Sequence, residues 1–171
     1  NTRSTAVSRT NGYVLSENTS FNSVMAWTIG NNVATYNFPV GNASGDYIPF
    51  VFDLNSGDAG VVSLATYPTS SGNLPLPPGV DHVNTDGGTD NSENTVDRFY
   101  LINLTGETSP DADITFNASA AEVGTISDLL AQRWNGDWES PKAGQTSGAT
   151  SVTVPGVTEF SPWAISGNSV P

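Results

Sequence analysis

Short apolar runs alternate with Gly, Pro, Asn and Asp along the chain, with a break roughly every eight to twelve residues. Each run is long enough for one strand, and each break supplies residues that tolerate turn conformations. This spacing is typical of two packed antiparallel sheets or of a barrel. We therefore predict an all-β fold, an antiparallel β-sandwich of the immunoglobulin-like or jelly-roll-like kind.

The strands can be placed from their alternation and from their β-branched and aromatic content. In residues 112–117, for example, Ile114 and Phe116 should face one side of a sheet, while Asp113 and Thr115 face the other. The predicted strands are Gly12–Ser16, Val24–Ile29, Ala34–Phe38, Tyr47–Asp53, Val61–Tyr67, Arg98–Leu104, Ala112–Asn117, Leu129–Trp134, Ser151–Val154 and Ser161–Ile165.

Turn signals separate these strands. Clusters of Gly, Asn and Asp predict turns at residues 41–45, 55–60 and 144–148. The dipeptide Asn135-Gly136 is the strongest hairpin signal in the chain.

Longer connections are also predicted. Residues 118–132 have helical composition, but Gly124 and irregular apolar spacing favour a turn or short helix that leads into a strand. The Pro-rich residues 68–78 and the Asp- and Asn-rich residues 86–97 predict long loops. We predict an N-terminal segment at residues 1–16 and a sandwich domain at 17–171, with a possible internal division near 68–97.

The charge balance is strongly acidic, with 5 Lys and Arg against 17 Asp and Glu and a net charge of −12. Phosphate backbones are bound by clustered Lys and Arg, which this chain lacks, so we expect no nucleic-acid partner. No apolar run is long enough for a membrane span, so we expect no membrane insertion. Charged residues make up only 13% of the chain, about half the usual share. The abundant Ser, Thr, Asn and Gly favour an extracellular β protein.

Catalytic signatures are missing from the sequence. There is no Cys, and the single His is His82. A Ser nucleophile needs a base within hydrogen-bond reach, and no Gly-x-Ser-x-Gly, Walker or dinucleotide motif is present. We predict that the chain is not an enzyme and that calcium is the one cofactor to consider.

A calcium site is suggested by oxygen-bearing side chains in one predicted loop. Calcium takes carboxylate and amide oxygens, but the spacing here matches no helix-loop-helix calcium motif. The alternative is that these residues simply make turns. The candidate ligands are Asp86, Asp90, Asn91, Glu93 and Asp97.

Aromatic residues allow two interpretations. Large aromatic side chains usually anchor a β core, which we expect for Trp27, Trp134 and Trp163. Aromatic rings can also stack on sugars when exposed. We take Trp138, just past the Asn-Gly turn, as the best candidate for exposure, with Tyr67 and Tyr100 as further stacking platforms. A carbohydrate-binding module is therefore the alternative function.

A series of short motifs runs in order along nearly the whole chain. Together it resembles the β-rich segment of large surface proteins of Bacteroidetes-type bacteria, which often precedes the C-terminal sorting domain read by the type IX secretion system. This resemblance implies a secreted protein at the cell surface, with no catalytic residues assigned. The motifs are Asn11–Ser16, Phe38–Gly41, Tyr47–Phe50, Ala65–Pro68, Asp97–Tyr100, Gln132–Trp138 and Val157–Trp163.

The N-terminal segment is the predicted contact with other copies of the chain. A free polar lead would fray unless it packs on something such as a neighbouring subunit. A strand donated to another subunit's sheet edge, or a head-to-tail contact, would generate filaments. We expect a mature structural or adhesive subunit of a bacterial surface assembly, with copies of itself as partner and surface glycans as a second candidate. The contact residues are Ala6, Val7, Tyr13, Val14 and Leu15.

Overall fold

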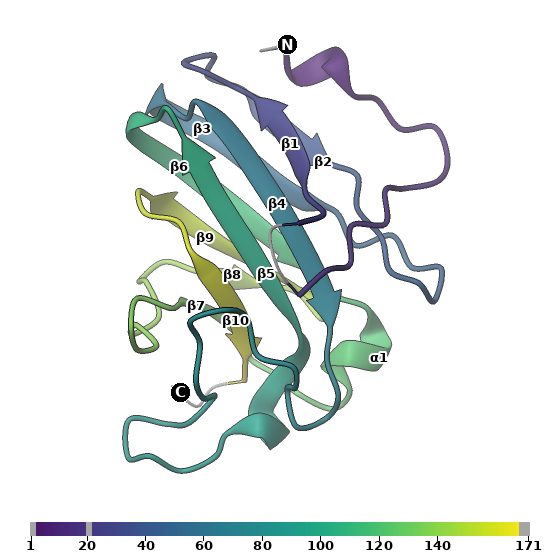
Figure 1. The fold of residues 1–171 in the computed structure, drawn as a ribbon, viewed down its shortest axis with the longest axis vertical. Helices are drawn as coiled ribbons and strands as arrows, with labels where there is room; N and C mark the ends of the chain where they lie inside the picture. The colour runs from purple at the N-terminus through teal and green to yellow at the C-terminus, as the bar shows by residue number, and fades with distance from the viewer. Residues whose placement is uncertain (1–2, 20–21, 168–171) are drawn as a thin grey trace.

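Two five-stranded antiparallel sheets pack face to face in the computed structural model (Figure 1), which describes residues 3–19 and 22–167. The predicted β-sandwich is confirmed. The first sheet has the order β1 (Met25–Thr28), β4 (Val61–Pro68), β5 (Thr95–Thr105), β10 (Pro162–Ser166) and β7 (Leu130–Arg133). The second has the order β2 (Thr35–Phe38), β3 (Phe50–Asp58), β6 (Thr108–Asn117), β9 (Ser151–Val157) and β8 (Thr146–Ser147).

Strands that are neighbours in the sequence hold the same position in the strand order of the two sheets. The pairs are β1 with β2, β4 with β3, β5 with β6, β10 with β9 and β7 with β8. Ring contacts between the sheets agree with this order. Trp27 of β1 packs on Tyr36 of β2 at 5.3 Å between ring centroids, and Tyr100 of β5 packs on Phe116 of β6 at 4.8 Å. The β1/β2 edge and the β7/β8 edge are therefore the two lateral ends of the sandwich.

The core between the sheets follows from the strand alternation. Ile114 and Phe116 are fully buried, as predicted. Trp27 and Trp163 lie in this core as well, and Trp134 is buried in a second cluster, which confirms the expected structural role of all three.

A second hydrophobic cluster lies on the outer face of the first sheet. There, Tyr67, Phe99 and Ala164 are covered by Val80 and Val83 from the long connection between β4 and β5, together with Trp134 and Trp138. Leu76 of the Pro-rich stretch packs against this cluster, so the connection covers the outer face of the sheet. β4 and β5 pair directly along eight positions, so this connection joins two neighbouring strands of one sheet.

Most predicted strands are present, but three local predictions were wrong. Residues 12–16 form no strand and make one parallel bridge, between Val14 and Val40. The predicted turn at residues 55–60 is mostly strand, because β3 continues to Asp58 through irregular pairing with β6. The predicted turn at 144–148 contains the short edge strand β8.

Local turn and helix chemistry agrees with the sequence. The Asn135 N–H donates to the Asp137 carbonyl oxygen at 2.9 Å, and Gly136 has a φ of +85°. The short helix α1 (Ala120–Val123) begins with a capping box between Ser119 and Glu122 and leads toward β7. Within the described ranges, the helical segments are α1 and the 3-10 turns η1 (Ser4–Ala6) and η2 (Ser92–Asn94), and no helix has the length and apolarity to span a bilayer.

Candidate functional site

The described N-terminal residues 3–17, which we call the strap, lie along the β1/β2 edge of their own sandwich (Figure 1). Val14 donates its N–H to the Pro39 carbonyl oxygen at 2.8 Å, and its own carbonyl oxygen accepts from Gly41. Tyr13 packs so closely on Gly41 that a Cβ there would meet its ring at 2.3 Å. The described strap is therefore seated on its own domain, while residues 1, 2 and 168–171 of the predicted segments lie outside the described residues.

The strap presents apolar side chains to solvent. Val14 and Leu15 are 42% and 54% exposed, and Val7 is 37% exposed. With Val24 and Val33, which flank β1 and precede β2, they make up five of the six large exposed apolar side chains among the described residues. Of the other predicted contact residues, Ala6 is exposed and Tyr13 is half-buried. We call the strap together with these flanking residues the strap edge.

A buried arginine holds the C-terminal end of the strap. Arg98 of β5 has no exposed side-chain surface, and its guanidinium donates to both carboxylate oxygens of Glu122 at 2.6 and 3.0 Å. It also donates to Glu17 at 2.9 Å and to Thr66 at 3.0 Å. This arrangement, the Arg98 clamp, ties strap, β4, β5 and α1 together.

The clamp sets the electrostatics of Glu122. Burial alone would raise the pKa of Glu122, but the hydrogen bonds and charge of Arg98, with the bonds to Ser119, lower it below its ordinary value. Burial and the charge of Glu122 raise the pKa of Asp97. The sequence did not lead us to predict this site. The signal for it was Arg98, a cation inside the apolar run of β5, since a buried cation needs a carboxylate partner.

Among the five predicted calcium ligands, Asp90 and Asn91 make local hydrogen bonds. Asp90 accepts from the backbone and side chain of Ser92 at 3.0 and 2.6 Å, which lowers its pKa. Asn91 is buried and accepts from Asn94, whereas Asp86 and Glu93 are exposed. Asp97 lies in β5. In the described part of the chain, no three His, Asp or Glu side chains are grouped so that they could hold a metal ion.

The predicted stacking platforms are not presented to solvent. Trp138, expected to be exposed, is 4% exposed, and Tyr67 and Tyr100 are 2% and 1% exposed. The Trp138 indole N–H donates to the His82 carbonyl oxygen at 2.8 Å, and its ring stacks on Phe99. The exposure prediction was wrong because the connection between β4 and β5 folds over the outer face of the sheet.

His82 takes part in this cover. Its ring packs edge-on against Trp134 at 5.2 Å between centroids, and its Nδ1 accepts from the Asn84 N–H. Its Nε2 lies 3.5 Å from Asp81 and 3.6 Å from Asp137. None of these contacts brings a Ser or Thr hydroxyl to the imidazole, so they do not form a nucleophile–base pair.

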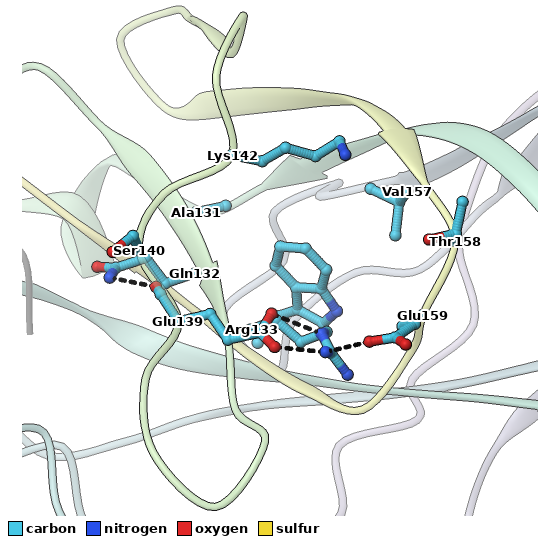
Figure 2. Close-up of a pocket in the computed structure, with 10 residues that line it drawn as sticks. Ala131, Gln132, Arg133, Glu139, Ser140, Lys142, Val157, Thr158 and Glu159 are labelled. Carbon is cyan, nitrogen blue, oxygen red and sulfur yellow. Dashed lines mark hydrogen bonds and ion pairs between the residues drawn. The ribbon is translucent and has the colours of Figure 1, made fainter.

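A pocket of about 360 Å³ opens at the β7/β8 edge (Figure 2). This edge is at the other end of the sandwich from the strap. β8 has only two residues, so it covers little of the space facing β7. The pocket lies between β7 and the segment that joins β9 to β10, and we call it the edge pocket. Figure 2 shows Arg133 between the carboxylates of Glu139 and Glu159, to which it donates hydrogen bonds, with Lys142 across the opening.

Trp163 also lines the edge pocket. It lies directly opposite Arg133 on the neighbouring strand and packs on Phe116 at 5.3 Å. Its indole Nε1 is buried and has no hydrogen-bond partner. Sequence reasoning assigned Trp163 to the core correctly, but nothing in the sequence indicated a pocket beside it.

Comparison with protein-family models, curated proteins and solved structures finds no match in any of the three. From its own structure, the chain is a β-sandwich with exposed apolar side chains at one edge and a polar pocket at the other. The resemblance to exported bacterial surface proteins stays an expectation.

Proposed function

We propose that this chain is a non-catalytic structural or adhesive module of an extracellular bacterial surface assembly, and that it contacts copies of itself through the strap edge. The observation that carries the proposal is that five of the six large exposed apolar side chains among the described residues belong to the strap or to the residues flanking β1 and β2, with Val33, Leu15 and Val14 the most exposed. Scattered apolar residues are normal on a protein surface, but a gathered set marks an interaction site.

Charge supports a second copy of this chain as the partner. The strap carries Arg3 and Arg9, two of the five cations, and only one of the seventeen acids, Glu17, whose carboxylate is held by Arg98. The net charge of the whole chain is −12, so the strap is a basic, apolar surface on an acidic molecule. Opposite potentials steer two surfaces together, and an unlike surface on the next copy gives a head-to-tail contact that can extend into a filament.

The seating of the strap favours contact between closed copies over donation of the strap to a neighbour. Glu17 is bonded to Arg98, and Val14 is paired on both sides with residues 39–41. Strand donation would have to break these bonds before forming equivalent ones elsewhere.

Sedimentation velocity over a range of concentrations tests the proposal. We expect the unaltered chain to associate reversibly and the Val14→Asp/Leu15→Asp variant to remain monomeric, because it places charge in the apolar contact. Leu74→Asp is the matched control, since Leu74 is 59% exposed but lies outside the strap edge. Monomers alone at every concentration, or equal loss of association in the control, would overturn the proposal.

A further inference from the structure

We infer that the edge pocket is a binding site for a neutral saccharide unit, held by Lys142, Glu159 and Trp163. This inference is independent of self-association, because the pocket and the strap lie at opposite ends of the sandwich. It also differs from stacking on Trp138, Tyr67 and Tyr100, whose rings are buried.

The first argument is an unused buried donor. Trp163 is 4% exposed, and its indole N–H has no acceptor. A buried polar group without a partner destabilises the structure that holds it, so a ligand oxygen that accepts this hydrogen bond would recover that loss. Because the nitrogen is closed to solvent, a ligand that makes this bond must shift side chains that line the pocket around Trp163.

The second argument is the mixture of donors and acceptors around the opening. Lys142, the only lysine of the chain, lines the pocket and supplies three donors. Glu159 gives one carboxylate oxygen, Oε2, to Arg133, which leaves Oε1 for a ligand. Thr158 and Ser140 add hydroxyls, each both donor and acceptor. Alternating donors and acceptors match sugar hydroxyls, which also donate and accept.

The third argument selects a neutral ligand over an acidic one. Arg133 and Lys142 are balanced by Glu139 and Glu159 within the pocket, so the site has no excess positive charge. The chain as a whole carries −12, which repels anions approaching any uncompensated site. A volume of about 360 Å³ lies in the lower range for small-molecule sites, about 300–1,000 Å³, and suits one or two sugar rings.

The arrangement gives each residue a separate role. Trp163 forms the inner wall and offers the buried N–H, while Lys142 and Glu159 contact hydroxyls at the mouth. Arg133 does not need to touch the ligand; it is a positioning residue that holds both glutamates through its guanidinium.

The test uses nuclear magnetic resonance of the 15N-labelled Val14→Asp/Leu15→Asp protein, so that self-association does not interfere. The probes are glucose, galactose, mannose, N-acetylglucosamine and their neutral disaccharides, with glucuronic acid as the acidic comparison. The chain has four tryptophans, and a Trp163→Phe variant assigns the Trp163 indole signal. We expect a neutral saccharide to shift that signal saturably.

Variants at the mouth make the test specific. Lys142→Ala and Glu159→Gln should each weaken binding about tenfold or more, because each removes a charged hydrogen-bond partner. Asp86→Asn, an exposed acid in another loop, should leave binding unchanged. The inference is overturned if no neutral saccharide shifts the Trp163 signal at millimolar concentration, if glucuronic acid binds more tightly, or if neither mouth variant weakens binding.

Discussion

Replacement of Arg98 by methionine should destabilise the fold strongly, because the clamp is closed to water. The Arg98 side chain has no exposed surface, while Glu17 and Glu122 are 16% and 10% exposed. Without the guanidinium, two carboxylates remain close together with no cation between them. Removing one partner of a buried ion pair costs about 3–5 kcal/mol.

Two details place the expected loss for Arg98→Met near the lower part of that range. Methionine keeps much of the apolar stem volume, and both carboxylates retain some contact with water. Thr66 keeps a partner, since its hydroxyl donates to the Phe99 carbonyl oxygen at 2.8 Å. We therefore expect the free energy of unfolding to fall by about 3 kcal/mol. This is a large part of the total free energy of unfolding of a domain, which is typically about 5–15 kcal/mol.

Urea unfolding at pH 7, followed by tryptophan fluorescence, measures this loss. With a slope of about 2 kcal/mol/M the midpoint should fall by about 1.5 M. Arg9→Met is the matched control. Arg9 is exposed and lies 3.8 Å from the centre of the Tyr47 ring, a contact worth about 0.5–1 kcal/mol. If Arg98→Met costs no more than Arg9→Met, the clamp does not stabilise the fold as argued.

Further predictions follow from the clamp and the strap. Because the pKa of Glu122 is lowered in the folded protein, the stability that its carboxylate contributes is present above its unfolded pKa and is lost as pH falls. The difference in unfolding free energy between the unaltered chain and Glu122→Gln, measured with urea, should therefore close below about pH 4. A constant difference down to about pH 3 would contradict this. Gly41→Ala should loosen the strap, since a Cβ would lie 2.3 Å from the Tyr13 ring. Trypsin should then cleave after Arg9 several-fold faster, roughly in proportion to the population of the open strap. Unchanged cleavage would refute the close packing. Self-association should weaken in about 1 M salt, where the screening length is about 3 Å, and sedimentation that does not change with salt would remove the charge contribution assigned to Arg3 and Arg9.

The fold was largely predictable because alternation and turn residues act locally. The burial of Ile114 and Phe116 and the turn at Asn135-Gly136 follow from side-chain direction and backbone preference within a few residues. The continuation of β3 to Asp58 was not predictable in this way. There, pairing with β6 overrides the turn preference of Asn55 and Gly57.

The sites were harder to predict because they depend on contacts between distant parts of the chain. Trp138 follows a surface turn, yet it is buried because Val80 and Val83 arrive from another connection. The Arg98 clamp joins residues up to 81 positions apart in sequence. The exposed Val14 and Leu15 were named from the sequence, but their position along the β1/β2 edge required the fold.

The most direct test of the proposed contact uses the absence of cysteine from these 171 residues. A nitroxide label can be attached at Leu15→Cys and, in a second protein, at Leu74→Cys, and its mobility followed by electron paramagnetic resonance as protein concentration rises. Mixing each labelled protein with unlabelled chain keeps the labels dilute. We predict that the label at position 15 becomes immobilised while the label at position 74 stays mobile. Equal mobility of both labels at every concentration would contradict self-association through the strap edge.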